Sequence, residues 1–249
     1  MMPHAPARPE TPCSSPAHWG AVWAALLVGL AALPAMAQPA GAPDHECDRL
    51  AQPPRQAMGR LPALAEGVGY ATLRAGAARA ACAQAMAEAP AEMRFVAYAA
   101  RAADKGGDSR EAARLYRIAA DGGNAMAQNN LGAMLEAGEG ALPRNPREAA
   151  RLYRLAADQG FPAGQANLGT LYAFGRGGLP RDDREAVRLF QMAAEQEDAQ
   201  AQTGLGVMYA EGRGGLPRDT QEAARMWRLA ADQGSTEARN NLRKLGVRN

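Results

Sequence analysis

The chain has few of the side chains on which hydrolytic and metal-dependent chemistry depends. Its 249 residues include three histidines, three cysteines and only 5% aromatic residues. The histidines are His4, His18 and His45, so a Ser/His/Asp triad has no base in the remaining four fifths of the sequence. The sequence contains no cluster of about four His, Cys, Asp or Glu residues that would predict a zinc site. We therefore expect no catalytic residue, no cofactor and no metal. Asp and Glu are plentiful, so catalysis by a pair of carboxyl groups is not excluded.

Neither sign of charge dominates, because 28 Lys and Arg oppose 26 Asp and Glu for a net charge of +2. Four arginines recur at equal spacing, which is one feature of a nucleic-acid-binding surface. Each of them follows a glutamate by three residues, and such pairs stabilise an exposed helix face. The arginines are Arg114, Arg151, Arg188 and Arg225. We predict a solvated face and no nucleic-acid partner.

The longest uncharged run lies near the N-terminus, from Trp19 to Leu33, and is followed by Ala35-Met36-Ala37. An apolar run with a small-x-small site is typical of a secretory signal peptide. We predict that residues 1–37 are removed, that the mature chain starts near Gln38, and that it is periplasmic or secreted. The alternative is an uncleaved membrane anchor. Residues 38–62 carry five prolines and are expected to form an extended or disordered arm.

A unit of 37 residues repeats along the second half of the chain. Leu131-Gly132 recurs as Leu168-Gly169 and Leu205-Gly206, and the segment Glu148 to Arg154 recurs in the same register. Each unit shows helical i, i+3, i+7 spacing twice, with a Gly-rich loop ending in proline between the two stretches. One helical hairpin cannot bury its own apolar face, so stacked copies predict a solenoid.

Small residues and aromatics indicate how the helices pack. Glycine in a helix costs about 1 kcal/mol relative to alanine, so a glycine repeated mid-helix predicts close helix–helix approach. One column of aromatic residues is expected to pack between layers: Tyr116, Tyr153, Phe190 and Trp227. Gly123, Gly160 and Gly234 are expected to close the turns as left-handed caps. Glu197 replaces that glycine once, so we expect its turn to differ.

The unit A-x-A-Q-x-x-L-G-x-x-Y … G-G-L-P-R-D-x-x-E-A-x-R … A-A-D-Q-G resembles the Sel-one-like repeat, a member of the tetratricopeptide (TPR) superfamily. The resemblance implies an all-α, right-handed superhelical solenoid of antiparallel helix pairs. It places full repeats at 124–160, 161–197 and 198–234, after a divergent TPR-like N-terminal layer at 63–123. Residues 235–249 are expected to form a C-terminal capping helix.

Two cysteines remain after residue 37, and export would expose them to an oxidising compartment. We hypothesise that Cys47 and Cys82 form a disulfide that joins the N-terminal arm to the first helical layer. The alternative is a pair of buried or free thiols.

The resemblance implies a non-catalytic adaptor or scaffold that binds a protein or peptide, of unknown identity, in a concave groove lined by the first helix of each unit. Asparagine suits such a surface because its amide both donates and accepts hydrogen bonds, although these asparagines could instead brace neighbouring hairpins. The candidate groove residues are Asn129, Asn130, Ala133, Glu136, Asn167, Thr170, Phe174, Thr203, Val207, Asn240 and Asn241. The alternative function is an enzyme, or a regulatory subunit of one, that acts on cell-wall peptidoglycan through two carboxyl groups with split pKa values.

Overall fold

A computed structural model describes Cys47 and residues 74–246. The chain divides into two units, Met1–Pro43 and Asp44–Asn249, and the described residues belong to the second. The predicted signal peptide and nearly all of the proline-rich arm lie outside the described residues. The described part contains ten α-helices and no strand, which confirms the all-α prediction.

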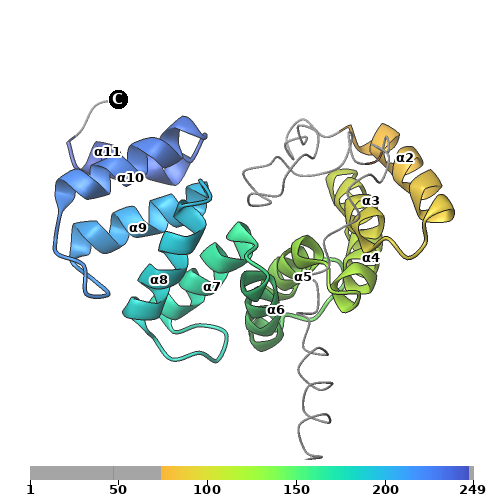
Figure 1. Cartoon of the computed structure of the whole chain (residues 1–249), viewed down its shortest axis with the longest axis horizontal. Coiled ribbons are helices and arrows are strands. Elements are labelled where there is room, and N and C mark those ends of the chain that lie inside the picture. Colours follow the sequence, from red (N-terminus) through yellow and green to blue (C-terminus); the bar gives the residue numbers. More distant parts are fainter. Residues whose placement is uncertain (1–46, 48–73, 247–249) are drawn as a thin grey trace, which may run out of the picture. The chain divides into compact units, whose positions relative to one another are not determined.

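The helices form antiparallel pairs after a leading helix, α2 (Ala75–Glu88) (Figure 1). We call the first helix of each pair an A helix and the second a B helix. The A helices are α3 (Met93–Lys105), α5 (Ala125–Ala137), α7 (Pro162–Phe174), α9 (Ala199–Glu211) and α11 (Thr236–Lys244). The B helices are α4 (Ser109–Asp121), α6 (Pro146–Asp158), α8 (Asp183–Ala194) and α10 (Thr220–Asp232).

Short polar side chains start most of these helices, because they accept hydrogen bonds from backbone amides that lack a partner within the helix. Asp219 accepts from the amides of Gln221 and Glu222 at the start of α10. Asn124 accepts from Ala127 at the start of α5. The sequence therefore sets the helix starts locally.

Glycines in the A helices leave space for the aromatic side chains of the B helices. A methyl group on Gly132 would lie 2.9 Å from the ring of Tyr153, and one on Gly169 would lie 2.9 Å from Phe190. A methyl group on Gly206 would come closer still to Trp227. The predicted close approach and the packing role of the aromatic column are confirmed.

The turn at Glu197 keeps the conformation of the other turns, so the expected local difference is wrong. Glu197 has a φ of 64°, close to the 79° of Gly160. The amide of Asp198 donates to the oxygen of Ala193, as Phe161 does to Ala156 in the preceding repeat. Packing of the next A helix fixes the direction of the chain here, and it outweighs the strain of a left-handed non-glycine residue.

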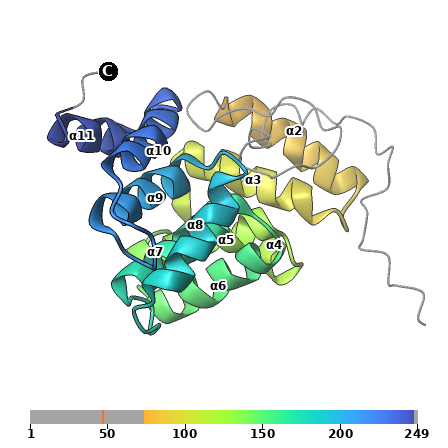
Figure 2. The same ribbon diagram turned by 60° about the vertical axis from the view of Figure 1, so that its left-hand side comes forward.

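Each helix packs on the next one, and the successive A helices α3, α5, α7 and α9 also contact one another (Figure 2). Contacts between successive B helices are sparser. The A helices therefore lie on the inner side of the stack. Ala238 and Leu242 of α11 are buried against α10 and close the apolar core at that end.

The Gly-rich loops between A and B helices dock on the start of the preceding B helix. A methyl group on Gly177 would lie 2.9 Å from the backbone oxygen of Pro146, and one on Gly140 would lie 2.5 Å from that of Ser109. A methyl group on Gly214 would come closer still to the backbone oxygen of Asp183. These loops thus hold neighbouring repeats together.

At the N-terminal side of the stack, Cys47 and Cys82 are fully buried and the structure joins them as a disulfide, with sulfur atoms 2.07 Å apart. Cys82 lies in α2, which packs on α3. This connection can attach the chain around Cys47 to the first helical layer.

Candidate functional site

The A helices present a narrow accessible face in which every third or fourth residue reaches the surface, while most of the others are buried. In α5 this face holds Asn130, Ala133 and Ala137. The corresponding residues are Asn167, Thr170 and Phe174 in α7, and Gly204, Val207 and Glu211 in α9. We call these nine residues, together with Gln200 one turn before Gly204, the A-helix face. It carries amides, small side chains, apolar groups and one carboxylate, Glu211, which is bound by Arg213.

Most of the predicted groove residues lie on or beside this face. Asn240 and Asn241 are partly exposed on α11, where the side chain of Asn240 accepts a hydrogen bond from Arg243. Asn129 and Thr203 are buried, with 7% and 5% of their surface exposed. Both side chains therefore lie below the accessible surface, and their predicted contact with a partner would require movement of the helices.

A chain of hydrogen bonds connects the asparagines of successive repeats. The Asn167 amide donates to Asn129 Oδ1 over 2.9 Å, and the Gln200 amide donates to Asn167 Oδ1 over 2.9 Å. Asn129 donates to Asn130, which donates to the hydroxyl of Tyr116 over 3.1 Å. The chain spans α4, α5, α7 and α9, which supports the bracing role. Each amide has two donor hydrogens, so hydrogen-bonding capacity remains for a ligand.

The other polar groups near the face have partners of their own. The Tyr153 hydroxyl donates to Glu136 Oε2 over 3.0 Å, and burial together with the Glu136 charge raises the pKa of Tyr153. The hydroxyl of Thr170 donates to the backbone oxygen of Ala166 over 2.9 Å. The face therefore offers asparagine and glutamine amides as its adaptable polar groups.

Phe174 ends α7 and is the most exposed large apolar side chain in the described part of the chain, with 57% of its surface accessible. The guanidinium of Arg176 lies 5.0 Å from the centre of its ring. This position joins an apolar surface and a positive charge at one edge of the A-helix face.

A pair of glutamines that was not predicted recurs in each full repeat. Gln159 at the end of α6 donates to Gln128 in α5 over 2.8 Å, and Gln233 donates to Gln202 over 2.9 Å. The third pair joins Gln196 to Gln165 over 3.1 Å. Both glutamines are present in the repeated pattern, so their shared recurrence could have indicated the contact.

The predicted glutamate–arginine pairs form on the outer surface of the B helices. Arg114, for example, contacts Glu111 over 2.7 Å, and Arg225 contacts Glu222 over 2.5 Å. More than half of each arginine side chain is exposed, so such pairs contribute less than about 1 kcal/mol.

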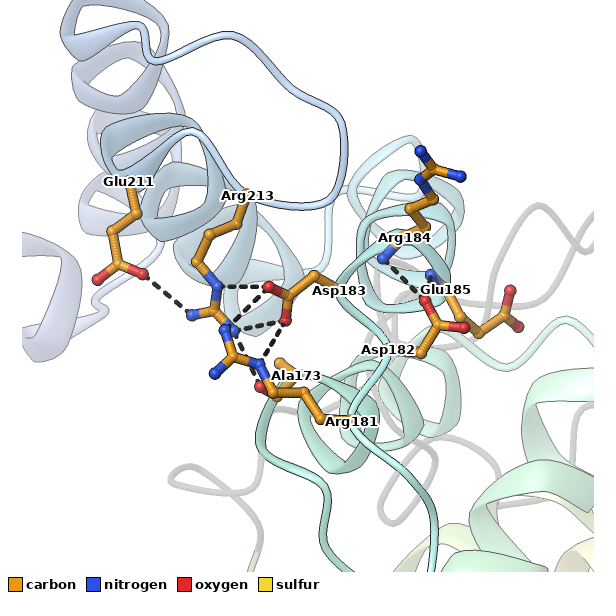
Figure 3. Close-up of polar contacts among 8 residues, drawn as sticks. All are labelled: Ala173, Arg181, Asp182, Asp183, Arg184, Glu185, Glu211 and Arg213. Atoms are coloured by element: carbon orange, nitrogen blue, oxygen red, sulfur yellow. Dashed lines mark hydrogen bonds and ion pairs between the residues drawn. The ribbon is translucent and has the colours of Figure 1, made fainter.

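A less exposed ion cluster connects the second and third full repeats (Figure 3). Arg213 donates two hydrogen bonds to Asp183, over 3.0 and 2.7 Å, and a third to the backbone oxygen of Ala173 over 2.9 Å. Arg181 contacts the same carboxylate over 2.9 Å. These hydrogen bonds from the two guanidinium groups hold the pKa of the Asp183 carboxyl well below its usual range. The repeat does not predict this cluster, because the other repeats carry Pro146 and Thr220 where this one has Asp183.

Replacing this carboxylate should destabilise the C-terminal repeats. We expect Asp183→Asn to lower the free energy of unfolding by about 2 kcal/mol at pH 7, because charge-assisted hydrogen bonds are lost. Since the folded-state pKa of Asp183 is lowered, its stabilisation is fully present above the unfolded pKa of about 3.9 and is lost progressively as the pH falls from there through the lower folded-state pKa. Urea titrations at pH 7 and pH 3, followed by Trp227 fluorescence in residues 38–249, test both points.

The matched control for this substitution is Glu148→Gln, which removes one exposed pair. It should cost no more than about 0.5 kcal/mol. Equal effects of the two substitutions, or a difference between wild type and Asp183→Asn that persists unchanged at pH 3, would contradict the assignment.

Within Cys47 and residues 74–246, no group of three or more His, Cys, Asp or Glu side chains is placed so that it could hold a metal ion. None of the helices of that part has the length and hydrophobicity needed to cross a lipid bilayer.

The paired helices, their repeated contacts and the shared inner face define an α-helical repeat solenoid. Four segments match the Sel1 repeat, at residues 104–124, 125–161, 162–198 and 199–235, and together they make up more than half of the chain. The chain therefore belongs to the Sel1 repeat family. The three full matches begin one residue after the repeats predicted above, and the partial match overlaps the divergent N-terminal layer.

Two solved structures are similar over about two thirds of the chain. One is a protective antigen present in uropathogenic Escherichia coli strains, which displays an SLR fold. It is 32% identical in sequence with a TM-score of 0.56, and the match covers 67% of this chain and 37% of the antigen. The other is a Sel1 repeat protein from Oxalobacter formigenes, 30% identical with a TM-score of 0.57, over 65% of each chain. The matched region spans less than two thirds of either relative. No curated protein matches the chain.

Family membership gives the general role of the fold. Sel1 repeats are generally protein–protein interaction modules, and the family is typically non-catalytic.

Proposed function

We propose that the chain is an exported, non-catalytic scaffold that binds a protein or peptide along the A-helix face. The observation that carries the proposal is the composition of this face. Amides, small residues and one exposed aromatic ring follow one another across α5, α7 and α9, and the one carboxylate of the face, Glu211, is bound by Arg213. Such a surface can pair with the backbone of an extended segment, and a rigid stack requires little ordering when it binds.

Export is proposed from the N-terminal sequence and from the cysteine pair. The uncharged run from Trp19 to Leu33 followed by Ala35-Met36-Ala37 is typical of a cleaved leader. Cys47 and Cys82 are placed so that they can form a disulfide, which persists in oxidising compartments.

Removing two of the amides should weaken partner binding. We expect Asn130→Ala/Asn167→Ala to recover a crosslinked partner from cell-envelope extract at least about tenfold less well than wild type, because two hydrogen bonds of about 1 kcal/mol each are lost. Quantitative mass spectrometry of the captured proteins measures the difference.

The control is Arg151→Ala/Arg188→Ala, which changes the exposed surface of the B helices. Circular dichroism should show that both double variants keep the helical content of the wild type. Identical sets of captured proteins from wild type and the asparagine variant would exclude the A-helix face as the binding surface.

A further inference from the structure

The exposure of Phe174 is not a consequence of the repeat. The other large apolar side chains exposed in the described residues follow the 37-residue period on the B helices, with 36–42% of their surface accessible: Ile118, Leu155, Met192 and Leu229. Phe174 has no such counterparts, because Ala137 and Glu211 occupy its position in the neighbouring repeats. A single aromatic side chain, 57% exposed on the inner side of the stack, needs its own explanation.

The surroundings of Arg176 also differ from those of the equivalent residues in the neighbouring repeats. The equivalent arginine of the next repeat, Arg213, is only 17% exposed and is held by Asp183. The preceding repeat has Glu139 at this position, so the loop does not require a cation for its conformation. Among the described residues Arg176 forms no ion pair, and its guanidinium lies over the Phe174 ring.

Within the described residues, the acidic side chains of the neighbouring ion cluster are already paired with other arginines. The carboxylates of Asp183 and Glu211 are both bound by Arg213, and Asp183 also binds Arg181. A ligand carboxylate could therefore approach the Arg176 guanidinium without competing with an existing ion pair. An apolar side chain beside that carboxylate would meet the ring of Phe174, next to Thr170 on the A-helix face.

We propose that Phe174 and Arg176 determine specificity for an acidic, apolar segment of a partner protein, in which a large apolar side chain packs on the Phe174 ring and a neighbouring carboxylate binds Arg176. This proposal rests on the proposed function and names the chemistry of the partner at one end of the A-helix face. Aromatic and arginine side chains are the types most enriched among dominant interface residues.

The repeat itself supplies substitutions that the fold tolerates. Phe174→Ala introduces the residue that the preceding repeat carries as Ala137, and Arg176→Glu introduces the residue carried as Glu139. Both variants should therefore fold as the wild type does. The probes are three labelled 12-residue peptides, composed of leucine and glutamate, leucine and lysine, or serine and glutamate, measured by fluorescence anisotropy on residues 38–249.

We expect the leucine–glutamate peptide to bind at least about tenfold more tightly than either of the others. Phe174→Ala should weaken its binding about fivefold or more, and Arg176→Glu about tenfold or more. Arg176→Glu should also bind the leucine–lysine peptide more tightly than wild type does. Arg228→Glu, the same change of charge at an exposed position on α10, should leave all three affinities within about twofold.

Equal binding of the three peptides to wild type, or unchanged binding by both variants, would overturn the proposal. An equal effect of Arg228→Glu would also overturn it, because net charge alone would then account for the result. If Asn130→Ala/Asn167→Ala loses its captured partner while Phe174→Ala and Arg176→Glu keep it, the A-helix face stands as the binding surface and the specificity assignment fails.

Discussion

Replacing Cys82 by alanine is expected to lower the free energy of local unfolding of α2 by about 4 kcal/mol. The disulfide closes a loop between residues 35 positions apart. Without it the unfolded chain gains conformational entropy, which favours unfolding by about 4 kcal/mol for a loop of this length. Because repeats in a solenoid contact only their neighbours, the amides of α9 and α10 should keep their protection. Hydrogen exchange measured helix by helix on residues 38–249 distinguishes these regions.

Reduction of the wild-type protein is the control, because Cys82→Ala also removes a fully buried sulfur atom. Reduced wild type should lose protection in α2 as the variant does. The intact mass of protein from the cell envelope should show a start near Gln38 and two hydrogens fewer than the reduced chain. Cysteines that react with an alkylating agent without reductant would contradict both the bond and its proposed role.

Gly214→Ala is expected to lower the free energy of unfolding of the C-terminal repeats by about 3 kcal/mol or more. The added methyl group would overlap the backbone oxygen of Asp183 and lie 2.5 Å from Val187 Cγ2. The φ of Gly214 is 65°, which adds the cost of a left-handed alanine. The loop would have to leave α8, and the contact of Arg213 with Asp183 would be lost with it. Urea titration followed by Trp227 fluorescence measures the change.

Gly215→Ala separates the two causes. Gly215 has a φ of 87°, but a methyl group there would meet no atom within 4 Å. Its substitution should therefore cost only about 1 kcal/mol, the conformational part. Similar costs at the two positions would show that close docking of the loop on α8 does not stabilise the stack.

Much of the fold follows from the sequence because the repeat carries its own packing rules. Gly169 opposite Phe190 and the pairing of Glu111 with Arg114 depend on residues of one unit, which their spacing along a helix or a hairpin identifies. The 37-residue period then extends each local contact to the other units. The family assignment and the all-α solenoid could be predicted for the same reason.

Contacts between units were harder to predict, because their sequence separations differ from the period. Asn129 and Asn167 are 38 residues apart, and Asp183 and Arg213 are 30 apart. The residues that contact one another depend on the angle between neighbouring hairpins, and the length of the repeat does not predict that angle. The burial of Asn129 and Thr203 has the same origin, since adjacent A helices cover positions that a single helix would leave exposed. The turn at Glu197 shows the opposite case, in which packing between units overrides a local preference.

The position of Phe190 has a consequence for how the chain can change in length. Its ring lies against Gly169 of its own hairpin and also against Gly204 of the following one. Removal of residues 162–198 would restore an aromatic–glycine contact at the new junction, because Tyr153 would then meet Gly204. The preceding units carry Asn130 and Asn167 at the position of Gly204, so this result is specific to that excision. The ion cluster would not survive such an excision of residues 162–198, since Arg213 would then face Pro146. Loss of this unit can therefore shorten the stack by one whole repeat, whereas the Asp183–Arg213 contact fixes the order of the last two.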